Sequence, residues 1–115
     1  MKRRVVAAWI VIAGASLGAS CDDSNGGPPE LTAEQREDPV LVTGEGVFAD
    51  QCATCHGADG HGSGSAPSLA AVEDRYSLEE QAALIEVGRG GMPPFSERLS
   101  DDEIEAVARY EREVL

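Results

Sequence analysis

The apolar and polar positions of the chain divide it into three parts with different patterns. Residues 5–15 form an apolar run that ends in small residues. Residues 22–41 are acidic and contain glycine and proline, which is typical of a linker rather than a packed element. After residue 43, segments with helix-start signals alternate with loops that contain glycine and proline. The pattern predicts a leader, a linker and one domain that contains helices.

Capping signals indicate where the first helices begin. Thr43 can cap a helix that runs into the pair of cysteines downstream. Ser77 forms a capping box with Glu80, the residue at the third helical position. The helix that Ser77 opens is expected to run to about Val87 and to stop at Gly88.

The last expected helix begins with the same device, a capping box of Ser100 and Glu103, and its early acids suit the positive end of the helix dipole. The apolar residues of this helix fall within one half of the helical wheel: Ile104, Val107, Ala108, Tyr110, Val114 and Leu115. The pattern predicts an amphipathic helix that packs against the rest of the domain.

The first 20 residues have the features of an export signal. Lys2, Arg3 and Arg4 precede the apolar run, and small residues follow it. From residue 5 to residue 19 there are about 15 apolar or small residues, fewer than the roughly 20 that a membrane-spanning helix needs. We therefore expect residues 1–20 to be a signal peptide.

The residues around Cys21 allow two kinds of cleavage. The run Leu17-Gly18-Ala19-Ser20-Cys21 is similar to a bacterial lipoprotein signal, although Gly18 stands where that signal has a branched apolar residue. Ordinary signal peptidase would cut the same bond and leave Cys21 without lipid. The acidic, Gly/Pro-bearing stretch at residues 21–42 favours lipidation, because a flexible tether of about 20 residues spans roughly 25 Å and would hold a small domain just off a membrane. We expect a lipid on Cys21.

The composition provides few large apolar side chains for the core of the domain. The chain has 115 residues and five aromatics, and one of these, Trp9, lies in the leader. A domain of roughly 80 residues seldom stabilises itself without a disulfide, a metal or another support. Three cysteines cannot all pair with one another in disulfides. The question is therefore what fills the core.

The charge of the chain restricts its partners. Its 9 Lys+Arg and 21 Asp+Glu give a formal net charge of −12, which argues against a nucleic-acid partner because phosphate contacts need a basic surface. Removal of the leader would also remove three of the cations and leave about −15 (6 − 21).

The sequence Cys52-Ala53-Thr54-Cys55-His56 is a C-x-x-C-H motif, the attachment signature of a c-type haem. Two residues between the cysteines place both sulfurs one helical turn apart, within reach of the two vinyl groups on one edge of the macrocycle. His56 is then held beneath the iron. We predict one haem c, bound covalently through Cys52 and Cys55, and this group would also supply the apolar body that the core lacks.

Three other interpretations of these residues explain less. A disulfide between Cys52 and Cys55 leaves His56 and the thin core unexplained. A thioredoxin-like redox pair expects a βαβ context, and no alternating strand pattern is present in the sequence. A zinc site needs four ligands, and the adjacent Cys55 and His56 are poorly placed to share a tetrahedral ion with Cys52 and His61.

The iron needs a second axial ligand, and few residues can supply it. Met1 lies in the leader, so Met92 is the remaining methionine. It lies in a loop where glycines allow the backbone close to the haem and prolines stiffen the chain. The alternatives are that Met92 only fills the core, or that His61 is the ligand, which would then have to reach around the haem from the side of His56. We expect His56 and Met92 to be the axial ligands.

The order of these motifs is that of a known family. Residues 43–115 begin with the C-x-x-C-H motif, continue to Gly91-Met92-Pro93-Pro94 and end in an amphipathic helix with Tyr110. In this order of motifs they resemble a small bacterial class I c-type cytochrome that carries one haem and is a lipoprotein. The resemblance implies an all-α domain, the class I cytochrome c fold, with three or four helices around one covalently attached haem.

The resemblance also implies two contacts inside the domain. A proline carbonyl shortly after the motif is expected to accept a hydrogen bond from the ligating histidine, and Pro67 stands at that place; the alternative is a proline that only shapes its loop. The last helix is expected to cross the first where a glycine permits close approach. The residues expected to meet at this crossing are Gly46, Val47, Phe48, Ala106 and Tyr110.

With both axial positions filled by the protein, no open site remains for a substrate or for oxygen, while the iron can still change oxidation state. We therefore predict a one-electron carrier between extracytoplasmic redox partners, and no enzyme in its own right. It would work in the periplasm or on the outer face of the cytoplasmic membrane, held by a lipid.

Two other functions stay open at this point. One is a fixed haem subunit of a larger oxidoreductase complex, and the other is a ligand-binding sensor haem whose bond to Met92 is weak or absent. The acidic charge predicts partners with basic docking surfaces, since charges of opposite sign steer encounter.

Overall fold

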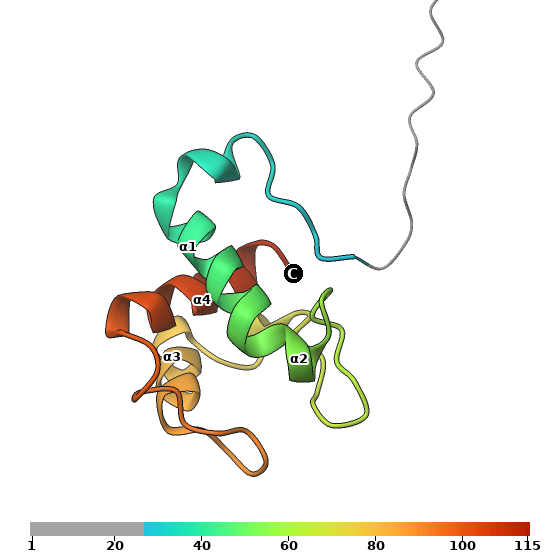
Figure 1. Ribbon diagram of the computed structural model, residues 1–115, viewed down its shortest axis with the longest axis vertical. Helices are drawn as coiled ribbons and strands as arrows, with labels where there is room; N and C mark the ends of the chain where they lie inside the picture. Colours follow the sequence, from blue (N-terminus) through green and yellow to red (C-terminus); the bar gives the residue numbers. More distant parts are fainter. Residues whose placement is uncertain (1–26) are drawn as a thin grey trace, which may run out of the picture.

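The structure, a computed structural model, describes residues 27–115 (Figure 1). The expected signal peptide and the lipidation site at Cys21 lie outside the described residues. Within the described part of the chain, no helix is both long and apolar enough to cross a membrane.

Four α-helices form the framework of the domain. α1 (Pro39–Val47) continues through a π-helical turn, η2 (Phe48–Cys52), into the short α2 (Ala53–His56). α3 (Leu78–Val87) and α4 (Asp101–Glu113) each follow a long loop.

Two 3₁₀ turns complete the regular structure. η1 (Gln35–Glu37) precedes α1, and η3 (Val72–Asp74) precedes α3. Residues 27–115 contain no β-strand. The predicted all-α fold of three to four helices is confirmed for these residues.

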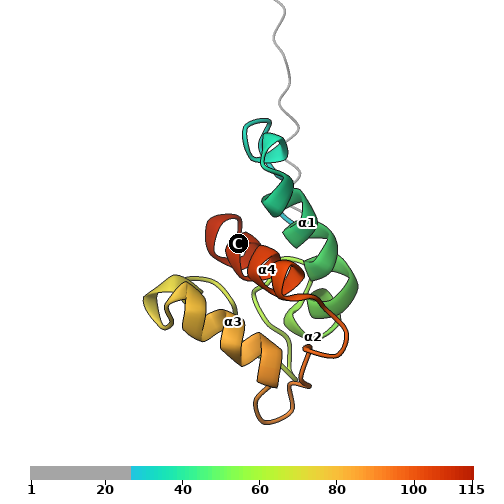
Figure 2. The ribbon, with the colours of Figure 1, turned by 90° about the vertical axis from the view of Figure 1, so that its left-hand side faces the viewer.

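α4 lies between α1 and α3 (Figure 2), so that it packs against both. The side chains of Phe48, Val107 and Tyr110 are the largest of those that are completely buried. The rings of Phe48 and Tyr110 lie with their centroids 5.5 Å apart. The expected packing of Phe48 on Tyr110 is therefore present.

The close approach of α1 and α4 depends on Gly44. A β-carbon added to this residue would lie 2.7 Å from the Cβ of Tyr110 and would collide with the carbonyl oxygen of Ala106. Gly46, which we expected at the crossing, would have nothing within 4 Å of an added β-carbon. The expectation for Gly46 was wrong, because the two glycines lie on different sides of α1 and the sequence does not show which side meets α4.

The first helix begins earlier than expected. The carboxylate of Asp38 accepts a hydrogen bond from the N–H of Val40 at 2.9 Å, and Pro39 occupies the first helical position. Thr43 lies inside α1, where its hydroxyl donates to the carbonyl oxygen of Pro39 at 2.9 Å. The prediction that Thr43 caps this helix was wrong, because the Asp38-Pro39 pair is the stronger start signal.

Part of the expected tether packs onto the domain. Leu31 and Leu41 are 4% and 2% exposed and belong to the core. The hydroxyl of Tyr110 donates to the carbonyl oxygen of Pro29 at 3.4 Å. The packed part of the chain therefore begins before residue 43, where we expected it to start. Burial of the two leucines stabilises this arrangement, because it removes apolar surface from water.

The two predicted capping boxes are confirmed. The Ser77 hydroxyl accepts from the N–H of Glu80 at 3.1 Å, and the Glu80 carboxylate accepts from the N–H of Ser77 at 2.8 Å. Ser100 and Glu103 make the same pair of bonds at the start of α4. α3 ends before Gly88, as expected. The predicted apolar face of α4 is buried at Ile104, Val107, Ala108 and Tyr110.

Candidate functional site

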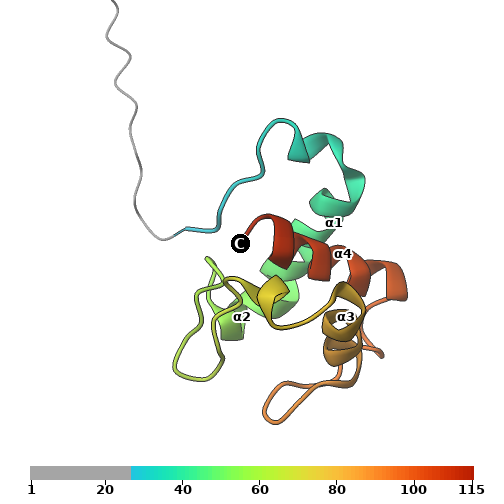
Figure 3. The ribbon, with the colours of Figure 1, turned by 180° about the vertical axis from the view of Figure 1, so that it is seen from behind.

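A cavity of about 670 Å³ opens next to α2 and is walled by parts of α2, α3, α4 and the loops that follow α2 and α3. Figure 3 shows these two loops at the lower edge of the molecule. The volume lies within the range of about 300–1,000 Å³ that ligand sites occupy. The cavity is lined by the five residues that we selected in this part of the sequence: Cys52, Cys55, His56, Pro67 and Met92.

The π-helical turn before the motif positions the two cysteines. The N–H of Ala53 donates to the carbonyl oxygen of Phe48, five residues earlier, so the helix is locally wider here. Cys52 is buried, Cys55 is exposed, and both are free thiols. Burial, with the charges of Glu111 and Cys55, raises the pKa of the Cys52 thiol to about 12. Neither cysteine is in a disulfide, and both line the cavity.

His56 is held in place by the loop that follows it. Its Nδ1 lies 2.8 Å from the carbonyl oxygen of Pro67, and its side chain is largely buried. When Nδ1 donates this bond, Nε2 carries the lone pair that a metal can bind. The loop is tied back to α2, because the Ser63 hydroxyl donates to the Cys55 carbonyl at 2.6 Å and the Gly62 N–H donates to the His56 carbonyl at 2.7 Å. The hydrogen bond that we expected between His56 and Pro67 is present.

Met92 lies in a hydrogen-bonded turn after α3. Arg89 and Met92 exchange two backbone hydrogen bonds, of 3.1 and 3.0 Å. Gly88 enters the turn with φ +72°, and a β-carbon there would lie 2.7 Å from the carbonyl carbon of Pro93. The buried Phe95 ties the other end of the loop to α3, since its N–H donates to a carbonyl of that helix at 3.1 Å. The turn thus holds Met92 in the cavity wall by its backbone.

His61, the rival ligand, does not line the cavity. Its side chain is 67% exposed, and its Nδ1 lies 3.5 Å from the carboxylate of Asp59. Residues 27–115 contain no cluster of three or more His, Cys, Asp or Glu side chains that could hold a metal ion. The four side chains considered for a zinc site are therefore not gathered together.

The cavity wall differs in charge from the chain as a whole. Three arginines line it, Arg75, Arg89 and Arg98, and the carboxylates there are Asp50 and Glu111. The whole chain carries 21 Asp+Glu against 9 Lys+Arg. The cavity is a locally basic part of an acidic chain, which suits a ligand that carries carboxylates of its own.

One buried polar pair in the cavity wall was not predicted. Gln81 on α3 and Glu111 on α4 are 4% and 5% exposed, and Nε2 of Gln81 donates to the Glu111 carboxylate at 2.7 Å. Burial raises the pKa of Glu111 to about 7, against the opposing effect of this hydrogen bond. The sequence held a signal for it, because Glu111 lies seven residues after Ile104 and so shares its buried helix face.

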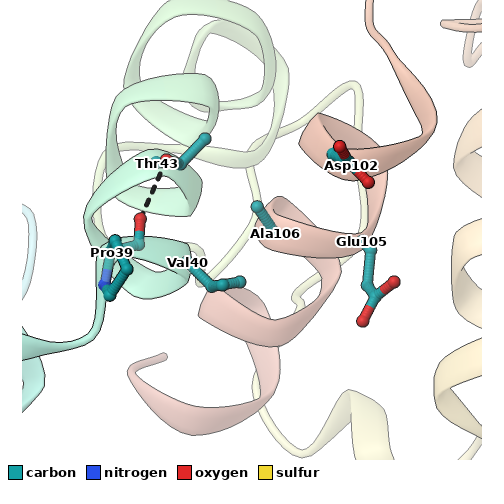
Figure 4. Close-up of a pocket in the computed structure, with 6 residues that line it drawn as sticks. All are labelled: Pro39, Val40, Thr43, Asp102, Glu105 and Ala106. Atoms are coloured by element: carbon teal, nitrogen blue, oxygen red, sulfur yellow. Dashed lines mark hydrogen bonds between the residues drawn. The ribbon is translucent and has the colours of Figure 1, made fainter.

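A second, smaller hollow lies in the groove between α1 and α4 (Figure 4). Its volume is about 310 Å³, and its charged lining groups are the carboxylates of Asp102 and Glu105. None of the residues selected from the sequence as a ligand or attachment point lines it. The larger cavity is therefore the candidate site.

Comparison with known proteins shows the family. The model of the family described as cytochrome C oxidase, cbb3-type, subunit III, matches residues 39–110. The chain belongs to this cytochrome c family. The resemblance to a small class I c-type cytochrome is thereby confirmed, and a covalently bound haem c is the cofactor that the family implies.

The relatives of this cytochrome include both long and short proteins. The cbb3-type cytochrome c oxidase subunit FixP of Sinorhizobium medicae is 36% identical over 85 residues, which cover 70% of this chain and 29% of FixP. Cytochrome c6 of Leptolyngbya boryana is 37% identical over 73 residues, or 60% of this chain and 86% of that protein. The solved structure of cytochrome c6 from the diatom Phaeodactylum tricornutum has a TM-score of 0.55 at 32% identity and covers 63% of this chain and 90% of that chain. The chain thus spans less than a third of FixP and most of cytochrome c6.

The residues of the cavity fit a haem c. The two free thiols line the cavity, and the imidazole of His56, the next residue, has Nε2 free when Nδ1 is bonded to Pro67. Met92 lines the same cavity from the loop after α3, and arginines are present to meet the carboxylates that a haem carries.

Proposed function

We propose that this cytochrome domain carries single electrons between extracytoplasmic redox partners. When bound, the haem supplies an iron that gains and loses one electron. The observation that carries the proposal is one cavity lined by the two motif cysteines and His56, from η2 and α2, and by Met92, from the loop after α3. The similarity to cytochrome c6 over most of that protein's length supports it.

The residues of the cavity have separate roles in this proposal. Cys52 and Cys55 would hold the haem through thioether bonds, and His56 and Met92 would be the two protein ligands of its iron. The carbonyl oxygen of Pro67 fixes the ring of His56 and its tautomer. Two protein ligands leave no position for a substrate, so the domain transfers electrons and catalyses no reaction of its own.

The absorption spectrum tests the ligands. The oxidised protein should show the weak far-red charge-transfer band of a methionine sulfur bound to iron, and Met92→Ala should abolish it. Leu84→Ala changes another side chain of the cavity wall and should keep the band. If the band persists in Met92→Ala at unchanged haem content, Met92 is not the ligand.

Carbon monoxide distinguishes the carrier from a ligand-binding sensor haem. The reduced wild-type protein should not bind carbon monoxide rapidly, because Met92 occupies the sixth position, whereas reduced Met92→Ala should bind it. Rapid binding by the wild type would favour the sensor.

A fixed haem subunit of a larger oxidoreductase complex is the second candidate. The family description and the similarity to FixP, which is described as an oxidase subunit, favour it. Purification from native membranes in mild detergent separates the two, because a subunit would elute with a larger complex and a carrier would elute alone.

We further propose that the domain is exported and anchored. Residues 1–20 act as signal peptide, Cys21 carries a lipid, and the following acidic stretch links it to the domain in the periplasm or on the outer face of the cytoplasmic membrane. The mass of the mature protein and its partition between detergent and water test this. Wild type should enter the detergent phase and Cys21→Ala should not.

The acidic surface supports partners with basic docking surfaces. Exposed carboxylates such as Glu79, Glu86, Asp101 and Glu105 surround the helices outside the cavity. Electron transfer to a basic redox protein should therefore slow as salt is added. A rate that does not depend on salt would contradict this docking mode.

A further inference from the structure

The carboxylate of Glu111 lies in the wall of the haem cavity and has no part in the electron transfer proposed above. It is 5% exposed, and its hydrogen-bond partner among residues 27–115 is Nε2 of Gln81, at 2.7 Å. The same amide group lies 3.4 Å from the carbonyl oxygen of Ala108, so Gln81 is held between two parts of α4. A buried carboxylate with one neutral donor is costly in its charged form.

Within the described part of the chain, no cation forms an ion pair with Glu111. The ion pairs within residues 27–115 involve other carboxylates. Arg112, the next residue along α4, donates instead to the carbonyl oxygen of Tyr76 at 2.8 Å and to Oε1 of Gln81 at 3.2 Å. Gln81 is thereby oriented, with its oxygen toward Arg112 and its nitrogen toward Glu111.

The other elements that pack against α4 bring few titratable groups toward Glu111. In η2 the titratable group near Glu111 is the Cys52 thiol, whose pKa the charge of Glu111 raises. From α1, Glu45 acts on the hydroxyl of Tyr110, and η3 leaves Glu73 and Asp74 exposed. The remaining charged and titratable groups of the cavity wall are Asp50, Cys55, His56, Arg75, Tyr76, Arg89 and Arg98.

We propose that Glu111 is a redox-linked proton acceptor, an inference that rests on the proposed function of the haem cavity. When a donor protein delivers one electron to this site, Glu111 takes up one proton from water, and on oxidation both are released. The electron reduces the iron from the ferric to the ferrous state. The proton forms one O–H bond and turns the carboxylate into a carboxylic acid.

Two effects set the direction of this coupling. Burial brings the pKa of Glu111 to about 7, where a small change in its surroundings alters its charge. An added electron in the cavity disfavours a second negative charge, so Glu111 binds its proton more tightly in the reduced protein. Linkage then requires the reduction potential to fall as the pH rises. A tenfold difference in proton affinity between the two oxidation states corresponds to about 59 mV.

The test is the reduction potential of the haem-loaded, full-length protein, measured by spectroelectrochemistry between about pH 5 and pH 8, where histidines also titrate. The wild-type potential should fall with pH. Glu111→Gln should lose this fall and stay near the wild-type potential at low pH, because the amide imitates the uncharged acid. If Glu111→Gln keeps the fall, the proposal is overturned.

Two matched controls separate Glu111 from other groups. Asp50→Asn removes the other carboxylate of the cavity wall, and His61→Gln removes an exposed imidazole. Both variants should keep the pH dependence of the wild type. If either one loses it while Glu111→Gln does not, the proton acceptor is that residue and not Glu111.

Gln81→Leu tests whether protonation of Glu111 sets the pH dependence of the reduction potential, which a purely structural role of Glu111 would not affect. The amide of Gln81 favours the charged carboxylate, so its removal should shift the pH-dependent window of the potential to higher pH. An unshifted window would contradict the proposal.

The wild-type protein alone supplies a further measurement, should Glu111→Gln fail to hold haem. The infrared difference spectrum at neutral pH should gain a carboxylic-acid carbonyl band on reduction, and isotopic labelling of glutamate should move it. Absence of that band overturns the proposal. A protein without haem, or without reversible one-electron reduction, would instead refute the proposed function.

Discussion

The two sides of α4 are completed in different ways. Toward α1, side chains of the chain itself fill the contact, with Phe48 and Tyr110 almost fully buried and Gly44 bringing the backbones together. Toward α3 and the loop of Met92, the chain borders a cavity of about 670 Å³. The core of the α1–α4 crossing is therefore filled by the protein itself, whereas the haem that the family implies would complete the cavity side. We therefore expect loss of the haem to destabilise α3 and the Met92 loop more than the α1–α4 crossing.

The largest effect is expected from loss of the haem. Cys52→Ala/Cys55→Ala removes both thioether bonds and, with them, the tightly bound body that fills the cavity. We expect the free energy of unfolding to fall by more than about 4 kcal/mol, the stabilisation supplied by a ligand present at about 1,000 times its Kd. Amide hydrogen exchange should show α3 and the Met92 loop losing protection before α1 and α4.

The matched control for this comparison is Thr54→Ala, which changes an exposed residue between the two cysteines, keeps both thiols and should leave both sides protected. Equal loss of protection in α1, α3 and α4 would show that the crossing depends on the haem as much as the cavity side does.

The crossing itself is broken by Gly44→Ala. The new β-carbon would collide with the Ala106 carbonyl and would lie 2.7 Å from the Cβ of Tyr110, so the helices must move apart. We expect chemical denaturation to report a loss of about 3 kcal/mol, the upper end of overpacking costs. Gly46→Ala, in the same helix with nothing within 4 Å, should instead stabilise by about 1 kcal/mol. Equal effects at the two positions would mean that the crossing is not where we place it.

On the cavity side, Gly88 is closely surrounded by backbone atoms. Gly88→Ala combines a φ of +72° with contacts to the backbone of Met92, Pro93 and Pro94. We expect a loss of about 2 kcal/mol in stability, together with a weakened far-red band, because the turn that presents Met92 must shift. Gly64→Ala, in the loop after α2 with nothing within 4 Å of the added β-carbon, should change neither the stability nor the band. A normal band in Gly88→Ala would show that ligation by Met92 does not depend on the geometry of this turn.

The smallest effect concerns α4, the helix that both sides share. Ser100→Ala removes the hydroxyl that accepts from the N–H of Glu103 at 3.2 Å, and should cost about 1 kcal/mol by thermal or chemical unfolding. The spectrum should not change, because the helix persists. Ser96→Ala, in the exposed loop before α4, serves as control and should be neutral. A spectral change in Ser100→Ala would show that the cavity depends on the start of α4.

Local signals in the sequence were sufficient for much of the fold and site. The capping boxes at Ser77 and Ser100 each lie within four consecutive residues, and the C-x-x-C-H motif within five. Because these patterns depend on neighbours along the chain, no knowledge of tertiary packing is needed to recognise them. The Pro67 contact required more, since eleven residues separate it from His56, and it came from the family resemblance.

The features that could not be predicted depend on how the helices meet. Gly44 and Gly46 look alike in sequence, and the position of α4 decides between them. Leu31 lies in an acidic stretch, so its burial shows only after the chain folds back onto the domain. Glu111 follows the period of the buried face of α4, but its partner Gln81 comes from another helix, 30 residues away.

The attachment of residues 29–31 to the domain has a mechanical consequence. The N-terminal segment is held by the burial of Leu31 and by the hydrogen bond from Tyr110 to Pro29, and Tyr110 lies at the α1–α4 crossing. In Figure 1 this segment lies at the opposite end of the molecule from the loop after α3. A force applied through the N-terminus would therefore load Leu31, Tyr110 and the crossing first. Because Glu111, the next residue of α4, lines the cavity, tension on the chain would reach the cavity wall through this helix.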